Sequence, residues 1–162
     1  MPGVGKSTLG ILLAKASQRA FVDTDVAVQT RSGRCLQDIV DQDGPEYLRR
    51  LEEQAIVALN CVNTVIATGG STVYSEPAMH HLGADGWIVH LYLPLDLLRP
   101  RLADFQARGV VRQRDQSIDS LFAERLPLYR RFAETTVDCS FKTHEQVVVE
   151  IGDQLRRYGD LP

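Results

Sequence analysis

The strongest chemical signal in the sequence is a glycine-rich run that ends in a lysine. It reads Gly3-Val4-Gly5-Lys6-Ser7-Thr8 and matches the G-x-G-K-[ST] core of a phosphate-binding loop. Glycines let backbone N–H groups converge on phosphate oxygens, the lysine reaches the β- and γ-phosphates, and the serine hydroxyl can hold Mg²⁺. The run opens a helical pattern, whose N-terminal dipole also favours phosphate. We predict ATP binding here; the alternative is a glycine turn with a solvated lysine.

A second signal is a pair of carboxylates at the end of a short apolar run. Residues 20–22 predict a buried strand, which Asp23-Thr24-Asp25 stops. Beside a phosphate loop, one such carboxylate can hold Mg²⁺ through water and the other can act as a base toward a substrate hydroxyl. We predict that Asp23 and Ser7 hold the metal and that Asp25 faces the acceptor. The alternative is that either aspartate caps a helix.

Four arginines lie in separate predicted elements rather than in one basic run. A guanidinium group binds carboxylates and phosphates through two parallel hydrogen bonds, so scattered arginines can converge on one anionic substrate. For each of them alone, a solvated surface position is the alternative. The four are Arg49, Arg101, Arg108 and Arg125.

The composition is that of one globular domain. The chain has 162 residues, of which 44% are hydrophobic and 24% charged, and these values exclude collagen-like, coiled-coil and disordered classes. A net charge of -3 gives no basic surplus for a nucleic acid. The three cysteines are too few and too widely spaced for a disulfide framework, and no apolar run is long enough to cross a membrane. We expect a cytoplasmic protein that binds small molecules, spanning residues 1–162 as a single domain.

Strand and helix patterns alternate along the chain, which predicts an α/β fold with a parallel sheet. The expected strands are 20–22, 64–67, 87–93 and 135–137. The expected helices are 6–18, 26–30, 36–40, 45–59, 76–82, 95–104, 117–132 and 145–158. Residues 104–117 are charged and aperiodic, which favours a mobile loop.

Taken in order, these motifs resemble the shikimate kinase family, small kinases that use Mg-ATP to phosphorylate a hydroxyl of shikimate. The resemblance covers nearly the whole chain, through residues 3–8, 21–25, 33–34, 48–53, 69–70, 108–111 and 125–129. It implies a three-layer P-loop kinase fold with five parallel strands. It also implies a substrate-binding helical segment at about 26–60, a lid at about 104–117 and a place in aromatic amino-acid biosynthesis. We expect a monomer.

The resemblance also implies roles for single residues on the acceptor side. Asp25 would contact the shikimate hydroxyls, and Arg49 and Arg125 would bind its carboxylate. Gly69 and Gly70 would let the backbone approach the ring.

On the nucleotide side, the resemblance implies that Arg108 reaches the transferred phosphate. Arg101 and Lys142 would lie on either side of the adenine. With Lys6 and Asp25, Arg108 would complete the catalytic set.

Three departures from the family pattern leave the acceptor open. Ser71 stands where the family has a third glycine, so we expect its side chain to intrude near the substrate. Leu48 replaces an aromatic residue, and Val110-Val111 follows Arg108 without the usual proline. The alternatives are a related kinase for another hydroxy acid such as gluconate, and a non-catalytic nucleotide-binding relic.

The start of the chain predicts a missing strand. A phosphate loop normally follows a strand, and only two residues precede Gly3. In the family that this sequence resembles, that strand lies between the strands expected at 64–67 and 87–93. We therefore expect four parallel strands with a gap where the fifth belongs, and a natural protein that starts upstream of Met1.

Overall fold

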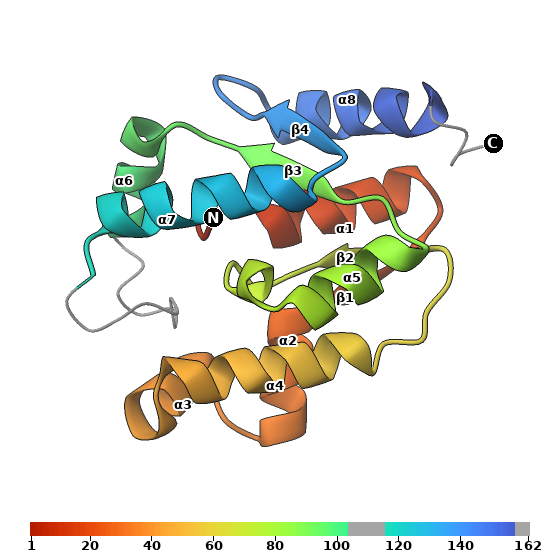
Figure 1. The fold of residues 1–162 in the computed structure, drawn as a ribbon. Helices are drawn as coiled ribbons and strands as arrows, with labels where there is room; N and C mark the ends of the chain where they lie inside the picture. Colours follow the sequence, from red (N-terminus) through yellow and green to blue (C-terminus); the bar gives the residue numbers. More distant parts are fainter. Residues whose placement is uncertain (104–115, 158–162) are drawn as a thin grey trace.

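The computed structural model describes residues 1–103 and 116–157, in which helices and strands alternate (Figure 1). The strands are β1 (Ala20–Asp23), β2 (Thr64–Ala67), β3 (Val89–Tyr92) and β4 (Thr135–Asp138). The helices are α1 (Lys6–Ala16), α2 (Thr24–Ser32), α3 (Leu36–Asp43), α4 (Pro45–Val57), the short 3₁₀ helix η1 (Thr72–Tyr74), α5 (Glu76–Ala84), α6 (Leu95–Ala103), α7 (Ile118–Phe132) and α8 (His144–Arg157). The predicted α/β class with parallel strands is confirmed.

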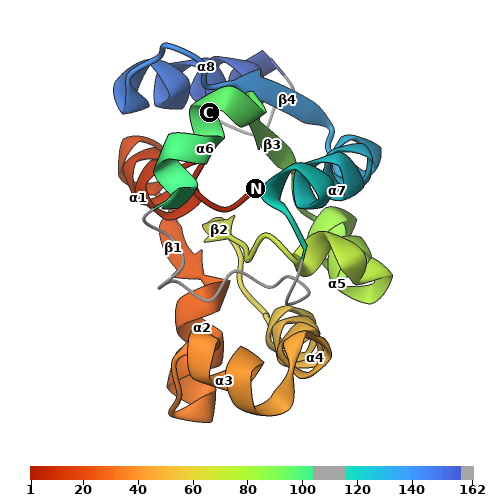
Figure 2. The same cartoon turned by 90° about the vertical axis from the view of Figure 1, so that its left-hand side faces the viewer.

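The four strands form two separate parallel pairs. β1 pairs with β2, with Ala20 opposite Thr64, and β3 pairs with β4, with Val89 opposite Thr135. Figure 2 shows the N-terminus between the two pairs. A cavity of about 850 Å³ is lined by the facing strands β2 and β3. The expected four strands with a gap are thus present, and the family's five-stranded sheet is not seen in the described ranges.

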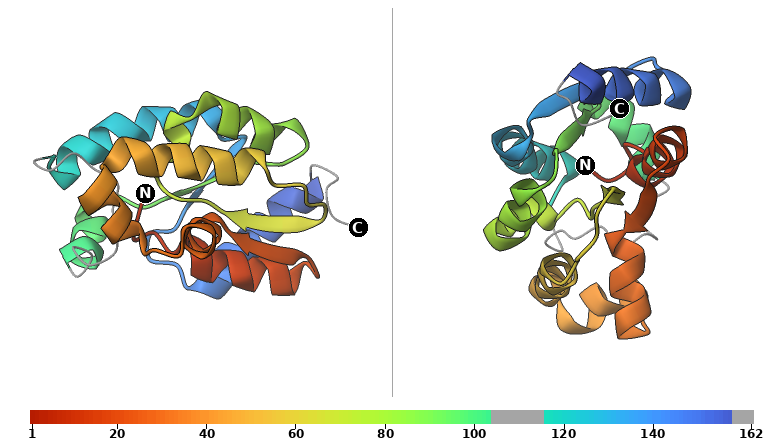
Figure 3. Two further views of the ribbon diagram at one scale, coloured as in Figure 1. Left: turned by 90° about the horizontal axis from the view of Figure 1, so that it is seen from below. Right: turned by 90° about the vertical axis from the view of Figure 1, so that its right-hand side faces the viewer.

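The larger core joins the phosphate-loop end of the chain to its C-terminal half. α8 packs against α1 (Figure 3). Fully buried side chains at the centre of this core are Leu98, Leu121, Val137 and Val147. α1 and the loop before it are therefore held from several sides.

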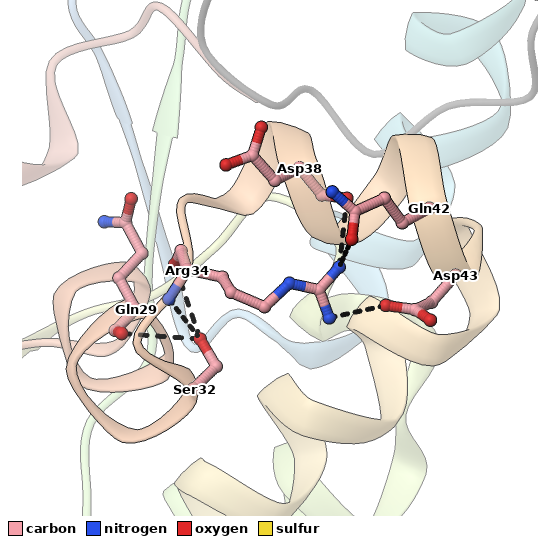
Figure 4. A network of polar contacts seen from close by, with 6 residues as sticks. All are labelled: Gln29, Ser32, Arg34, Asp38, Gln42 and Asp43. Carbon is pink, nitrogen blue, oxygen red and sulfur yellow. Dashed lines mark hydrogen bonds and ion pairs between the residues drawn. The ribbon is translucent and has the colours of Figure 1, made fainter.

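Helices α2, α3 and α4 form a second, smaller body below the β1–β2 pair in Figure 1. Their apolar residues make a separate cluster around Ile39 and Leu48, which are fully buried. Arg34 joins α3 to the turn before it (Figure 4): its guanidinium donates to Asp43 Oδ2 at 2.6 Å, to Gln42 Oε1 at 3.0 Å and to the Asp38 carbonyl at 3.1 Å. This body carries Arg49 on α4.

The sequence-based boundaries agree with the structure except at a few points. α2 begins at Thr24 rather than Val26 because the Asp23 side chain caps its first turn. The 3₁₀ helix η1 follows the Gly69-Gly70 loop and has no counterpart among the predicted elements. The expected loop and lid at 104–117, with Arg108, fall almost entirely outside the described residues. Among the helices described, none has the length and apolar character to cross a membrane.

Candidate active site

The predicted phosphate loop has the backbone shape that its glycines were expected to allow. Gly3 and Gly5 have φ angles of +77° and +98°, in the left-handed region that favours glycine. α1 begins directly afterwards at Lys6. The backbone N–H groups of its first turn have no partner within the helix, and no acidic side chain lies in that turn. The loop therefore presents N–H donors and a helix N-terminus to an anion.

Lys6 does not extend into solvent, as the alternative of a solvated lysine would require. It is partly buried, and its Nζ donates to the Met1 carbonyl at 3.0 Å. Burial lowers its pKa, and the nearby Asp25 opposes that shift. The lysine ammonium thus interacts electrostatically with the carboxylate that we predicted to face the acceptor.

Asp23 and Asp25 have different surroundings, one capping a helix and the other buried without a partner for Oδ1 among the residues described. Asp23 Oδ1 accepts from the backbone N–H groups of Asp25 at 3.0 Å and Val26 at 3.4 Å, so Asp23 caps α2. Asp25 lies in the first turn of that helix, and its Oδ1 is buried with no hydrogen-bond partner among the residues described. Burial raises the pKa of Asp25. A buried carboxylate oxygen without a partner suits a ligand hydroxyl.

The Gly69-Gly70 loop passes directly in front of this carboxylate. A Cβ added at Gly69 would lie 2.7 Å from Asp25 Oδ1 and 2.3 Å from Glu52 Oε1, and a Cβ at Gly70 would lie 3.1 Å from Arg125 Nη1. A larger residue at position 69 would therefore have to displace both carboxylates. The Tyr129 hydroxyl donates to the Gly70 carbonyl at 2.7 Å, which fixes the loop from α7.

The structure brings Arg49 and Arg125 together from different helices. Arg125 is 1% exposed, and its Nε donates to the Tyr74 hydroxyl at 3.1 Å. The Arg49 guanidinium lies over the Tyr74 ring, 4.0 Å from its centroid, and its Nη1 donates to Glu46 at 2.7 Å. Both arginines therefore meet at one aromatic ring beside the glycine loop.

Ser71 is bound to a buried carboxylate from α4. Its hydroxyl donates to Glu52 Oε2 at 2.5 Å, and both residues are 3% exposed. The buried carboxylate on α4 thus holds the hydroxyl, and the expected intrusion of this side chain near the substrate stays a prediction. Leu48, beside Arg49, is fully buried in the core of the α2–α4 body.

Two functional candidates were missed by sequence reasoning. Glu52 lies three residues after Arg49, on the same side of α4, and burial raises its pKa to about 7. The sequence signal that could have identified Glu52 is its place on the face of α4 that is otherwise apolar, with Leu48, Ala55 and Ile56. Tyr74 carried no signal, because its importance depends on arginines from two other elements.

Ser7, Arg101 and Lys142, which we expected to bind the metal or the adenine, are more exposed than Arg125 and Glu52. The Arg101 side chain lies beside the phosphate loop, 3.7 Å from the position of a Cβ on Gly3. Lys142 forms an exposed ion pair with Glu150 at 2.5 Å, so it is held against α8. Ser7 is exposed at the start of α1. The Ser7 hydroxyl and the Asp23 carboxylate are oxygen donors of the kind that Mg²⁺ prefers. Within the described ranges, His, Cys, Asp and Glu form no metal-binding cluster of three or more.

Comparison with known proteins identifies the family. The family model for shikimate kinase matches residues 2–156. The chain is 38% identical to "Shikimate kinase 2" of Enterobacter sp. (strain 638), over 95% of this chain and 91% of that protein. It is 34% identical to a shikimate kinase of Sulfurihydrogenibium sp. (strain YO3AOP1), over 96% of this chain and 93% of that one.

Two solved structures share the fold described above. The shikimate kinase from Acinetobacter baumannii in complex with shikimate has a TM-score of 0.86 and 25% identity, and the match covers 96% of this chain and 89% of that one. The shikimate kinase from Aquifex aeolicus has a TM-score of 0.81 and 31% identity, with 98% and 94% covered. The phosphate loop, the unpartnered Asp25 carboxylate and the paired arginines thus occur in a chain that belongs to the shikimate kinase family of ATP-dependent phosphotransferases.

Proposed function

We propose that this protein transfers the γ-phosphoryl group of ATP to a hydroxyl of shikimate, giving 3-phosphoshikimate for aromatic amino-acid biosynthesis. The observation that carries the proposal is Asp25, whose buried Oδ1 has no partner in the described residues and lies close to the phosphate-loop lysine. Beside Gly70 of the same loop lies Arg125, which with Arg49 can bind a carboxylate. One molecule that carries both a hydroxyl and a carboxylate would satisfy Asp25 and the two arginines.

The chemistry follows from these positions. Asp25 accepts the proton of the acceptor hydroxyl as that oxygen attacks the γ-phosphorus, and the bond to ADP breaks. Burial raises the pKa of Asp25, which makes this carboxylate a stronger base. Lys6 and the backbone N–H groups at the start of α1 offset the negative charge of the transferred group. We include Arg108 in this task on the strength of the family resemblance alone.

Mg²⁺ belongs to the proposal as the ion that neutralises the ATP phosphates. Ser7 and Asp23 would hold it, Asp23 through water, because both supply oxygen atoms near the phosphate loop. Arg101 and Lys142 would flank the adenine, and Lys142 would have to leave Glu150 to do so.

The proposal also covers the place of the acceptor, the oligomeric state and the cell compartment. We place the acceptor between the helical segment at about 26–60 and the Gly69-Gly70 loop of one domain, with the lid at about 104–117. We propose a monomer in the cytoplasm, which fits reduced thiols: Cys35, Cys61 and Cys139 are all free.

The test compares acceptors and then removes the base. With ATP and Mg²⁺, we expect turnover with shikimate and much less with gluconate or with shikimate methyl ester, which lacks the charge that the arginines would bind. Asp25→Asn should lower kcat by about 10²-fold or more, the range for loss of a general base. ATP affinity, measured by calorimetry, should be retained.

The matched control is Asp153→Asn, an exposed aspartate on α8 that is paired with Arg156. It should leave kcat unchanged. Near-normal turnover by Asp25→Asn would remove that residue from the mechanism. ATP binding without turnover on any acceptor would instead favour the nucleotide-binding relic, and preferred turnover with gluconate would favour the related kinase.

A further inference from the structure

Tyr74 lies between the two arginines that the proposed function assigns to the acceptor carboxylate. It ends η1, directly after the Gly69–Ser71 loop. The guanidinium carbons of Arg49 and Arg125 lie over its ring, 4.0 Å and 5.1 Å from the centroid. Two cations placed this close repel each other, and the negative face of an aromatic ring offsets part of that repulsion.

The Tyr74 hydroxyl adds a directional contact. It donates to Glu124 Oε1 at 2.5 Å, so its hydrogen points toward that carboxylate and a lone pair is available to Arg125. Arg125 Nε donates to this oxygen at 3.1 Å. With Nε held on the tyrosine side, Arg125 Nη1 lies on the glycine-loop side, 3.1 Å from the position of a Cβ on Gly70.

The ring and the hydroxyl therefore perform separable tasks. The ring holds Arg49, which within its own helix donates to the exposed Glu46. The hydroxyl accepts the hydrogen bond from Nε and so restricts rotation of the planar Arg125 guanidinium about the Cδ–Nε bond. An aliphatic side chain at position 74 would perform neither task.

We propose that Tyr74 is a positioning residue that sets the two guanidinium groups for binding of the acceptor carboxylate. The inference rests on the proposed function and deepens it by naming the residue that builds the carboxylate site. Tyr74 acts through Arg49 and Arg125 and takes no part in proton or phosphoryl transfer.

The experiment compares Tyr74→Leu and Tyr74→Phe with the unchanged protein, using shikimate and shikimate methyl ester as acceptors. Tyr74→Leu should raise the KM for shikimate about tenfold, the effect expected from loss of a cation–π contact and a hydrogen bond to a charged group. The KM for ATP should not change, and kcat should fall much less than the KM rises. Tyr74→Phe keeps the ring and should raise the KM for shikimate only about threefold.

The decisive readout is the preference for the carboxylate over its ester, expressed as the ratio of the two kcat/KM values. This ratio should fall about tenfold in Tyr74→Leu and about threefold in Tyr74→Phe, because only the charged acceptor uses the arginines. A purely structural role would lower activity toward both acceptors equally. The matched control is Tyr47→Leu: this tyrosine lies over Arg50, with its ring centroid 5.7 Å away, and is 37% exposed. It should leave the ratio unchanged.

The outcomes separate the two proposals. No turnover of shikimate by the unchanged protein would overturn the proposed function and this inference with it. Normal turnover with an unchanged ratio in Tyr74→Leu would overturn this inference alone, as would an equal fall in Tyr47→Leu. If Tyr74→Leu does not fold, the ratio in Tyr74→Phe decides, and an unchanged value there overturns the role of the hydroxyl in setting Arg125.

Discussion

At the scale of single residues, Glu52 is a buried acid in the candidate site whose charged form is disfavoured by burial. Burial raises its pKa from 4.5 to about 7, the Ser71 hydroxyl lowers it, and the Asp25 carboxylate raises it again. Asp25 and Glu52 meet at Gly69, where a Cβ would lie within 3 Å of an oxygen of each. The Ser71 hydroxyl donates to this carboxylate of Glu52 and therefore favours its charged form, against the effect of burial.

The raised pKa of Glu52 predicts a pH dependence of stability. An acid whose pKa is higher in the folded protein than in the unfolded chain binds more protons when folded. The free energy of unfolding therefore falls as pH rises from about 4.5 to about 7. A shift of this size corresponds to roughly 3 kcal/mol. Glu52→Gln should remove this part of the pH dependence in urea titrations between pH 5 and 8.

Ser71→Ala provides the matched comparison for Glu52. Loss of the hydroxyl removes a contact that lowers the pKa of Glu52, so the decline in stability should persist and move to higher pH. Parallel stability curves for the unchanged protein and Glu52→Gln would contradict this explanation.

At the scale of elements, Arg34 determines how α3 follows α2. Its guanidinium satisfies three acceptors, including Asp43 at the far end of α3. The Ser32 hydroxyl donates to the Gln29 carbonyl at 3.3 Å, and the Arg34 N–H donates to that hydroxyl at the same distance. Gly33, with a φ of +65°, ends α2 and makes the turn that leads to α3.

We expect Arg34→Ala to destabilise the α2–α4 body by about 1–2 kcal/mol, because it removes charge-assisted hydrogen bonds from a partly buried group. Arg34→Lys should recover only part of the lost stability, because an ammonium group lacks the planar fork with which the guanidinium reaches three acceptors. Thermal unfolding of both variants, with Arg31→Ala on the exposed face of α2 as control, measures the effect. Equal melting temperatures for Arg34→Ala and Arg31→Ala would show that the network contributes nothing.

At the scale of the whole molecule, the cavity between the two strand pairs is the main departure from a continuous sheet. β2 and β3 face each other across it, and among residues 1–103 and 116–157 each is paired on one side only. Met1 lines the same cavity, where burial, Lys6 and Arg125 hold the pKa of its α-amino group well below the ordinary value. Unpaired strand edges and a buried amine beside two cations both cost free energy.

An extended apolar segment in this cavity should therefore stabilise the protein. We expect five β-branched residues and a glycine, fused to Met1, to raise the melting temperature by at least about 5 °C, because they pair both strands and convert the amine to an amide. A fusion of equal length in which prolines replace all five β-branched residues has no N–H group at those positions to donate to either strand, and it should give no gain. Equal melting temperatures for the two fusions would contradict strand pairing.

The order of elements and the identity of the chemical groups could be predicted from the sequence, because both depend on neighbouring residues. Hydrophobic periodicity located β2 and the main helices, and the glycine-lysine run located the phosphate loop. Asp25, Arg49 and Arg125 were found through their type and through the resemblance of their surroundings to one family. Their predicted roles remain to be tested by the variants above.

Contacts between residues far apart in the sequence were decided only by the tertiary structure. Tyr74 became important because Arg125, 51 residues later, donates to it, and Ser71 turned inward because Glu52, 19 residues earlier, is buried beneath it. Strand pairing likewise depends on which edges meet, so two separate pairs could not be read from local patterns. The direction of a side chain and the charges around it depend on packing. A sequence pattern predicts such neighbours only for residues that are close in the chain, such as those three or four apart on a helix.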